Sequence, residues 1–307
     1  MSSNTLRRFT QGIFLLSMTY VAWAHQFFGG GPNGRPPIDA FCPFGGLESL
    51  YGFIAYGEFI KRTNLSNVIL LVGTILTAIV VGRAFCGWIC PLGTLQEWLN
   101  RLGQRIMGKN FSPPEKIDRY LRSLKYLFLL LIIALTWHTG TLVFRDLDPW
   151  VAYAHIFGGW EKLTERPIGL ILLVVTLVGA IFIDRLWCKY LCPLGAFLGL
   201  FHKFSLVKLG VDQQQCVQCG KCERKCTMQV SILQDHVQGS ECIACGECVN
   251  HCVKPGTLAM RFGKKTISIL MVGIITIGLF MGTYLAAKST GLWITKGNAQ
   301  IHMEEER

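Results

Sequence analysis

Five long apolar runs alternate with polar segments along the chain. They predict helices over about 9–28, 66–85, 124–143, 167–187 and 266–287. A helix needs ~20 apolar residues to cross a hydrocarbon core of roughly 30 Å, and each run is of this order. We therefore predict an α-helical membrane protein with about five transmembrane helices.

The polar segments between the runs differ in charge. Segment 101–125 is strongly basic, whereas segment 144–166 is balanced to slightly acidic. Because Lys and Arg collect in the cytoplasmic loops of membrane proteins, segment 101–125 is predicted to be cytoplasmic. In the inner membrane of a prokaryote, the N-terminus and residues 188–265 then lie in the cytoplasm. Residues 29–65, residues 144–166 and the C-terminal tail lie outside.

Composition supports a membrane protein and argues against a nucleic-acid partner. Hydrophobic residues make up 51% of the 307 residues and charged residues only 16%, whereas soluble domains carry about a quarter of charged residues. The net charge of +11 is explained by basic loops, and no nucleic-acid-binding module is recognisable. The first apolar run has no convincing small-residue cleavage site, so we expect a retained helix rather than a signal peptide.

Two apolar runs end in nearly the same polar signature. "RAFCGWICPLG" stands at 83–93 and "RLWCKYLCPLG" at 185–195, with the cysteines offset by 102 residues. The first copy continues into "LQEWLNRLGQRI" at 95–106, whose apolar positions predict an interfacial helix. A shortened copy, "FCPFGG", stands at 41–46 and keeps one cysteine, Cys42. The two full copies predict an internal repeat about an axis along the membrane normal.

The repeated signature places a cysteine pair beside a proline. The residue before a proline is pushed out of helical geometry, so Cys90 and Cys192 are expected where a helix unwinds. Backbone N–H groups freed there can turn toward an anionic sulfur site. The four cysteines could meet as one site that holds an additional iron–sulfur cluster, a soft metal such as copper or two redox-active disulfides, or they could be buried structural residues. They are Cys86, Cys90, Cys188 and Cys192.

Two further cysteine runs carry the strongest chemical signal. "CVQCGKCERKC" at 216–226 and "CIACGECVNHC" at 242–252 share the spacing C-x2-C-x2-C-x3-C. This spacing resembles that of bacterial ferredoxins with two [4Fe–4S] clusters, in which the fourth cysteine of each run ligates the other cluster. Four-cysteine zinc sites are the alternative. The proline that usually follows the fourth cysteine is replaced by Thr227 and Val253.

The ferredoxin resemblance implies two ligand sets. Cluster 1 would take Cys216, Cys219, Cys222 and Cys252, and cluster 2 would take Cys242, Cys245, Cys248 and Cys226.

These features divide the chain into four predicted parts. Residues 1–65 hold the first transmembrane helix and an outer loop, and residues 66–207 hold the repeated helices with their C-x3-C-P motifs. Residues 208–262 form an inserted cytoplasmic ferredoxin domain with two clusters, and residues 263–307 form the fifth helix and an outer tail.

From about residue 66 to 262 the layout resembles membrane polyferredoxins related to the NapH quinol dehydrogenase subunit. The resemblance implies electron transfer between the quinone pool and a partner redox protein, with membrane lipid, quinone, and other redox subunits or ferredoxin-like carriers as partners. NosR-like proteins and CcoG-like assembly proteins carry the same signatures. A metal-handling or redox-centre assembly factor, or a membrane anchor of a larger dehydrogenase, is therefore an alternative function.

A quinone site needs a proton acceptor near the membrane edge and an apolar slot. On the predicted outer side the possible acceptors are His25, His138, His155, Asp148, Glu48 and Glu58. His25 and His138, at the ends of two predicted helices, could also ligate a haem.

Aromatic and basic residues complete the set of sequence-based expectations. Four tryptophans predict an aromatic belt at the outer interface, namely Trp23, Trp137, Trp150 and Trp160. Lys221, Arg224 and Lys225 are expected to be a docking face for an acidic carrier or a solvated surface.

Overall fold

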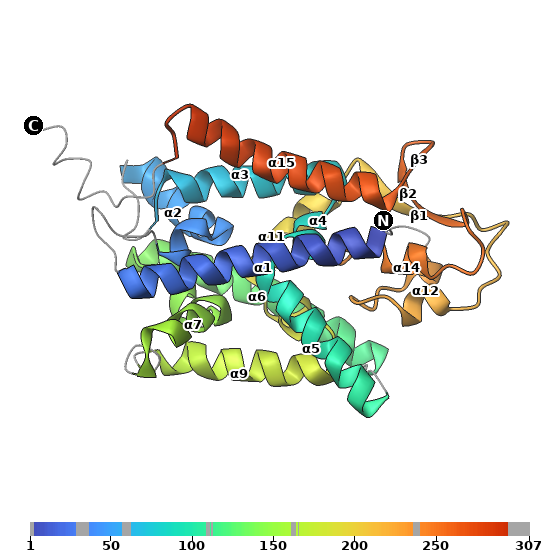
Figure 1. Cartoon of the computed structure of the whole chain (residues 1–307), viewed down its shortest axis with the longest axis horizontal. Coiled ribbons are helices and arrows are strands. Elements are labelled where there is room, and N and C mark those ends of the chain that lie inside the picture. The colour runs from blue at the N-terminus through green and yellow to red at the C-terminus, as the bar shows by residue number, and fades with distance from the viewer. Residues whose placement is uncertain are drawn as a thin grey trace, which may run out of the picture.

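Helices dominate the structure, a computed structural model, and most of the long ones lie side by side along one direction (Figure 1). The structure describes residues 3–28, 37–56, 63–108, 111, 113–160, 164, 166–235 and 240–293. Glu58 and the tail after residue 293 therefore lie outside the described residues.

All five predicted long helices are present, with shifted ends. They are α1 (Ser3–Phe28), α3 (Leu65–Val81), α6 (Glu115–Thr139), α9 (Pro167–Phe182) and α15 (Ile269–Ser289). Helix α3 ends early because Gly82 has a φ of 69°, and α9 ends before Arg185, which has a φ of 53°. Helix α6 begins earlier than predicted, directly after Pro114.

Two helices in the described part of the chain are long and apolar enough to cross a membrane. They comprise Lys116–Thr139 within α6 and Ile269–Ser289, which is α15. Helices α3 and α9 are apolar but shorter, at 17 and 16 residues. Five transmembrane helices therefore remain a prediction, whereas the helical class is confirmed.

Short helices follow α3 and α9 in the same order in both repeats. Helices α4 (Ala84–Trp88) and α5 (Pro91–Met107) follow α3, and helices α10 (Leu186–Tyr190) and α11 (Pro193–His202) follow α9. Each cysteine pair therefore lies where a five-residue helix ends and a helix with proline at its first position begins. The predicted unwinding before Pro91 and Pro193 is confirmed.

A second set of short helices packs at the end of the bundle where α1 and α6 finish (Figure 1). It consists of η1 (Ile38–Phe41), α2 (Pro43–Tyr56), η2 (Phe144–Asp146), α7 (Pro149–His155) and η3 (Ile156–Gly158). Helix α2 packs along α3, and α7 packs along α9. The shortened Cys-Pro signature opens α2, because Pro43 is its first residue.

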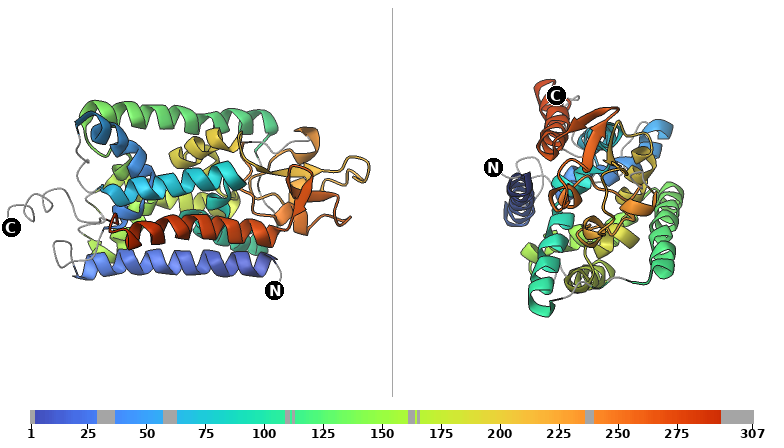
Figure 2. Two further views of the ribbon diagram at one scale, coloured as in Figure 1. Left: turned by 90° about the horizontal axis from the view of Figure 1, so that it is seen from above. Right: turned by 90° about the vertical axis from the view of Figure 1, so that its right-hand side faces the viewer.

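A small α/β unit closes the opposite end of the bundle, next to the start of α1 (Figures 1 and 2). We call residues 207–267 the cysteine-rich unit. Its elements are β1 (Val207–Val211), α12 (Lys221–Arg224), α13 (Ile232–Asp235), α14 (Glu247–Asn250), β2 (Leu258–Phe262) and β3 (Lys265–Ile267). The strands form one antiparallel sheet in the order β1-β2-β3, with Val211 opposite Leu258 and Phe262 opposite Lys265.

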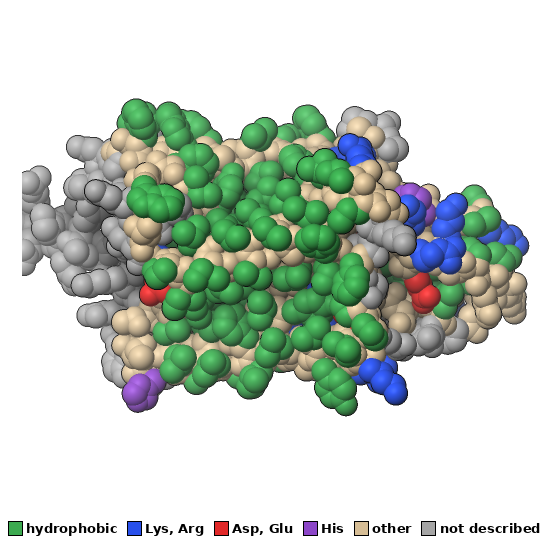
Figure 3. Space-filling model, turned by 90° about the horizontal axis from the view of Figure 1, so that it is seen from below, with side chains coloured by type: hydrophobic (Ala, Val, Ile, Leu, Met, Phe, Trp, Pro, Cys, Tyr) green, Lys and Arg blue, Asp and Glu red, His purple; other side chains and the backbone are tan. Residues whose placement is uncertain are grey.

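The bundle exposes apolar side chains and buries charged ones. Apolar side chains spread along one face of the molecule, and Lys and Arg side chains gather at the end with the cysteine-rich unit (Figure 3). Helix α5 follows the same rule, since Trp98, Leu102 and Ile106 are exposed while Glu97 and Asn100 are buried. This arrangement suits an apolar surrounding, because buried charges need partners inside the protein.

Close packing of α3 against α15 generates a prediction about Gly73. A Cβ atom at Gly73 would lie 2.4 Å from Thr283 Oγ1, whereas one at Gly278 in α15 would meet nothing within 4 Å. Overpacking costs ~1–3 kcal/mol, so Gly73→Ala is expected to lower the thermal unfolding midpoint of the detergent-solubilised protein. Gly278→Ala is the matched control and should leave the midpoint unchanged or raised. Equal midpoints for both variants would contradict this packing.

Candidate functional site

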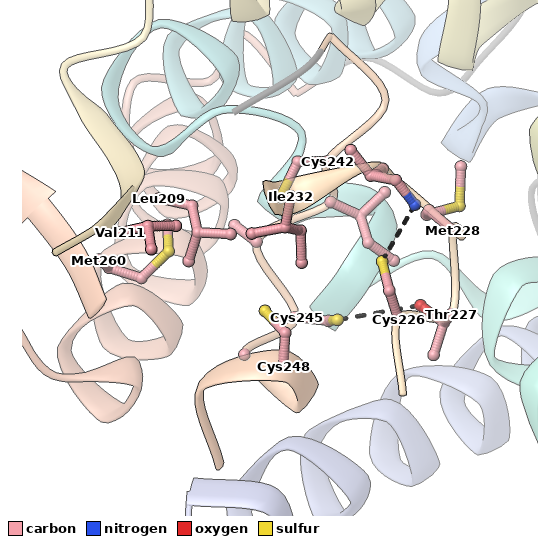
Figure 4. Close-up of a pocket in the computed structure, with 14 residues that line it drawn as sticks. Leu209, Val211, Cys226, Thr227, Met228, Ile232, Cys242, Cys245, Cys248 and Met260 are labelled. Atoms are coloured by element: carbon pink, nitrogen blue, oxygen red, sulfur yellow. Dashed lines mark hydrogen bonds between the residues drawn. The ribbon is translucent and has the colours of Figure 1, made fainter. Parts of the chain in front are cut away.

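Four cysteines line one buried cavity of the cysteine-rich unit (Figure 4). They are Cys226, Cys242, Cys245 and Cys248, which is the ligand set predicted for cluster 2. The backbone N–H of Val230 donates to Cys226 Sγ at 3.5 Å, and Thr227 Oγ1 lies 3.9 Å from Cys245 Sγ. The remaining lining is largely apolar, including Leu209 and Met260, so the thiols face a mostly apolar space.

A second cavity brings together the set predicted for cluster 1. It is lined by Cys216, Cys219, Cys222 and Cys252. The two loops repeat one backbone geometry, since Gln218 and Ala244 have φ values of 50° and 48° and the following glycines also have positive φ. The two cavities differ in accessibility, because Cys219 is exposed whereas Cys245 and Cys248 are buried.

The donor chemistry of these cavities fits iron–sulfur clusters. Soft thiolates are the usual cluster ligands, and each cavity offers four of them together with backbone N–H groups. Among the described residues, no three His, Cys, Asp or Glu side chains are placed to hold a single metal ion. The ligand assignment remains a prediction, and the structure brings each predicted set to one cavity.

The four cysteines of the C-x3-C-P pairs also lie near one another. Burial raises the pKa of the Cys192 thiol, and Cys188, Cys86 and Cys90 raise it further. Cys192 caps α11, where its Sγ accepts the N–H of Gly195 at 3.3 Å. The N–H of the glycine three residues on contacts Cys90 and Cys42 in the same way. The repeated Cys-Pro-x-Gly signature is therefore a helix start in which a sulfur accepts a backbone N–H.

The arginine before each cysteine pair crosses to the other repeat. Arg185 Nη1 donates to the carbonyl oxygen of Cys86 at 2.7 Å, and a Cβ atom at Gly93 would lie 2.7 Å from the same nitrogen. A Cβ atom at Gly195 would lie 2.8 Å from Arg83 Nη2. The last glycine of each signature thus leaves the space in which the arginine of the other signature packs.

A buried and a partly buried glutamate neutralise these arginines. Glu97 pairs with Arg185 at 2.7 Å and also with Arg7 and Arg101. Burial would raise the pKa of Glu97, but Arg7, Arg185 and Arg101 lower it to about 2. A charged carboxylate is therefore the form of Glu97 at neutral pH.

Glu241, directly before Cys242, plays the same part for the other arginine. It pairs with Arg83 at 3.1 Å and with Lys125. Burial would raise the pKa of Glu241, but Arg83 and then Lys125 lower it. This pair ties the cysteine-rich unit to the first repeat.

Some arginine N–H groups in this region have no partner within the described residues. They are Nε and Nη2 of Arg83 and Nε of Arg185, whose side chains are fully buried. Burying such donors unpaired costs ~1–3 kcal/mol or more. Because both guanidinium groups interact electrostatically with thiols of the C-x3-C-P pairs, the region fits an anionic thiolate-bound group.

The cysteine-rich unit touches the first C-x3-C-P pair directly. A Cβ atom at Gly87 would lie 2.4 Å from the carbonyl oxygen of Ile243 and 3.6 Å from Cys245 Cα. Trp88 Nε1 donates to the carbonyl oxygen of Ala244 at 3.1 Å. The residues between Cys86 and Cys90 therefore pack on the loop that carries the buried thiols.

A third cavity, of about 110 Å³, lies on the other side of the C-x3-C-P pairs. Its lining includes Cys42, Cys90 and Cys192 as well as Asp148 and Trp150. Sequence reasoning placed Cys42 across the membrane from the other two, yet all three line one space. Trp150, predicted to join an interfacial belt, is part of this lining, whereas Trp23, Trp137 and Trp160 are exposed as expected.

The other predicted proton acceptors are scattered. Glu48 accepts hydrogen bonds from Thr136 Oγ1 and the Phe144 N–H, at 3.0 and 3.1 Å. His25 lies in the last turn of α1 and His138 in the last turn of α6, and these helices stand on opposite sides of the bundle (Figure 2). His155 ends α7. The structure does not bring His25 and His138 together as a haem would require.

Sequence reasoning missed the glutamates and Arg7. Arg7 stands just before the first predicted apolar run, yet it is fully buried between Glu97 and Glu247. The available signal was the polar face of segment 95–106, because Gln96, Glu97 and Asn100 also recur at helical spacing.

Glu97 supports a prediction about stability. Glu97→Gln removes the carboxylate that three guanidinium groups share: Arg7 and Arg101 keep Glu247, whereas Arg185 loses the carboxylate with which it pairs. Removing one partner of a buried ion pair costs ~3–5 kcal/mol. The thermal unfolding midpoint at pH 7 should fall sharply. Because the folded pKa is depressed, the stabilisation of the unsubstituted protein is full above about pH 4.5 and is lost as the pH falls toward 2.

The control for this prediction is Arg101→Gln. Arg101 is the most exposed of the three partners, with 27% of its side chain accessible, so its loss should cost much less. A Glu97→Gln midpoint equal to that of Arg101→Gln would refute the central role of Glu97.

Comparison with known proteins supports this chemistry. The family described as "4Fe-4S binding domain" matches twice, at residues 63–110 and 165–212, and these segments contain the two C-x3-C-P pairs. The two matches are offset by 102 residues, so the internal repeat is confirmed. No solved structure gives a significant match.

Relatives occur in bacteria and archaea. YccM of Escherichia coli, named as an electron transport protein, is 29% identical over 75% of this chain and 68% of its own length. MJ0750 of Methanocaldococcus jannaschii is 34% identical over 63% of this chain and 75% of its own length. The ferredoxin-type protein NapH of Haemophilus influenzae is 28% identical over 59% of this chain and 61% of its own length. With its two 4Fe-4S binding domains, the chain belongs to the NapH-type family of ferredoxin-type membrane proteins.

Proposed function

We propose that this protein carries electrons between the membrane quinone pool and a soluble redox partner through three thiolate-bound iron–sulfur centres in series. The observation that carries the proposal is the order of the sulfur sites. An accessible four-cysteine cavity is followed by a buried one, which packs on the C-x3-C-P pairs. Beyond them lies the cavity with Asp148. A series of closely spaced centres is what electron transfer through a membrane protein requires.

The first two centres are [4Fe–4S] clusters held by the ferredoxin-like cysteine sets. The cluster at Cys216, Cys219, Cys222 and Cys252 is the terminal that meets the soluble partner, because Cys219 is exposed. The cluster at Cys242, Cys245, Cys248 and Cys226 lies deeper and links it to the helices.

A third cluster at the C-x3-C-P pairs accounts for two separate observations. Four thiols, two buried and two partly buried, lie in electrostatic contact, and two buried arginines beside them retain N–H groups without a partner among the described residues. An anionic cluster would accept those N–H groups and would offset the desolvation of both guanidinium ions. The segments that match the 4Fe-4S binding domain are the ones that contain these thiols.

The membrane arrangement follows the sequence prediction. We place the cysteine-rich unit and the N-terminus in the cytoplasm, and α2 and α7 near the outer face of the inner membrane. Residues at the N-terminus and in the cysteine-rich unit do lie together, since Arg7 pairs with Glu247 at 2.9 Å. The third cavity, with Asp148, then sits between the cluster layer and the outer face, so the relay needs no haem.

Iron counting tests the number of centres. In anaerobically purified protein we expect about twelve irons per chain, four for each [4Fe–4S] cluster. The double variant Cys86→Ala, Cys188→Ala is expected to lose about four irons and to retain the spectroscopic signals of the two ferredoxin-like clusters. Cys42→Ala should retain all of the iron. A wild-type content of about eight irons would contradict the third cluster. If quinol still reduced the protein in that case, the proposed electron transfer would stand with two clusters instead of three.

A basic surface beside the accessible cavity supports an acidic partner. Lys221, Arg224 and Lys225 are exposed on and next to α12, and Lys254 is exposed next to Cys252 and Val253. Opposite charges steer such encounters and raise the association rate.

The partner surface is tested by charge reversal. The double variant Lys221→Glu, Arg224→Glu is expected to slow electron transfer to a small acidic ferredoxin at least tenfold at low salt, with a smaller difference at high salt. Lys208→Glu, an exposed charge on β1, is the matched control and should retain most of the rate. Equal rates in all three proteins would remove the basic surface from the proposal.

A further inference from the structure

Three helix starts of one type surround the third cavity. Cys42, Cys90 and Cys192 each precede the proline that begins α2, α5 or α11. All three cysteines line the cavity, whereas Cys86 and Cys188 do not. The shortened signature at residues 41–46 therefore lines this cavity together with the two full signatures of the internal repeat.

The rest of the lining is aromatic and apolar with one carboxyl group. Trp150, Trp187 and Phe144 are among the rings that face the cavity, and Asp148 is its acid. Asp148 Oδ1 accepts the N–H of Trp150 at 2.9 Å, which fixes the carboxyl group at the start of α7. Burial is the main cause that raises the pKa of the Cys42 thiol, and the nearby carboxylate of Asp148 is the second.

The electrostatics of the site favour negative charge inside an apolar space. The three helices have 14, 17 and 10 residues, long enough for their N-termini to carry partial positive charge. In each helix the N–H of the third residue, a glycine, contacts the cysteine sulfur, as the Gly195 N–H to Cys192 Sγ contact shows. A lipid acyl chain would fill the apolar volume and would use neither the carboxyl group nor the helix N-termini.

We propose that this cavity binds the head group of a membrane quinone, with Asp148 as its hydrogen-bond partner and the three Cys-Pro helix starts facing its ring oxygens. A quinone ring is flat and mostly apolar, carries oxygens at opposite edges and becomes anionic during reduction. The cavity is also bordered by Phe14 and Met18 of α1 and Phe280 of α15. Both helices expose apolar side chains on their outer faces, so an isoprenoid tail would meet a lipid-compatible surface there.

This inference rests on the proposed exchange of electrons with quinone, and its test separates the two. The probe is a short-tailed azidoquinone, photolysed with full-length protein in lipid nanodiscs, and the adducts are located by mass spectrometry. We expect adducts on residues 14–18 or 148–150 and competition by the same quinone without the azide. Binding affinity is measured in parallel with that competitor.

Two positions on α1, two residues apart and on different faces of the helix, give a matched pair of variants. Met18→Trp fills the cavity from α1 and should weaken quinone binding at least tenfold. Leu16→Trp places the same ring on the outer face of α1, where Leu16 is 70% exposed, and should bind like the unsubstituted protein. Asp148→Asn should weaken binding of the quinol form of the competitor about tenfold, because a charged carboxylate accepts the quinol hydroxyl more strongly than an amide oxygen does. Cluster absorbance after dithionite reduction and the unfolding midpoint show whether each variant is folded.

The outcomes divide clearly. Adducts elsewhere, or unchanged binding in both Met18→Trp and Asp148→Asn, would overturn the location while reduction of the clusters by quinol still upheld the proposed function. Clusters that dithionite reduces and quinol does not would overturn the function itself. Labelling that is displaced by phospholipid and is insensitive to Asp148→Asn would show an acyl-chain cavity and would also overturn the inference.

Discussion

The carboxylate of Glu97 is the interaction on which the rest of the structure depends. It meets Arg7 from the first helix, Arg101 from its own helix and Arg185 from the second repeat. Charges buried this deeply are stable only when their partners are held in place, because an unpaired charge in a low-dielectric interior costs several kcal/mol. The N-terminal helix, both repeats and, through Glu247, the cysteine-rich unit are therefore fixed by one cluster of charges.

This polar centre explains the inverted surface of the molecule. Apolar side chains face outward along the helices, an arrangement that water would disfavour. Ion pairs and hydrogen bonds lie inside. In a bilayer, helix association gains little from burying apolar surface, so close packing at small residues and polar contacts must provide specificity. The packing of Arg83 on Gly195 and of Arg185 on Gly93 provides contacts of this kind.

Local patterns predicted the helices and the cysteine sets, and long-range contacts determined what the sequence left open. The apolar runs predicted each long helix, because a period and a length are local properties. The ferredoxin-like spacing grouped Cys226 with Cys242, Cys245 and Cys248, as the cavity does. The convergence of Cys42 with Cys90 and Cys192 was not predictable, since it depends on how α2 packs beside α3. The exchange of arginines between repeats was hidden for the same reason.

The exchanged arginines have a consequence for how such a protein could arise. In a single ancestral repeat, the arginine could not pack on the glycine of the same repeat. Such a repeat would therefore lack a packing site for its guanidinium group, and it would also lack a second pair of thiols. Two copies supply both at once, whether as a symmetric dimer or as one duplicated chain. Duplication within one chain then frees each copy to diverge, and Glu97 in one repeat and the neighbouring Glu241 of the cysteine-rich unit show that divergence. This asymmetry distinguishes the two ends of the proposed electron path.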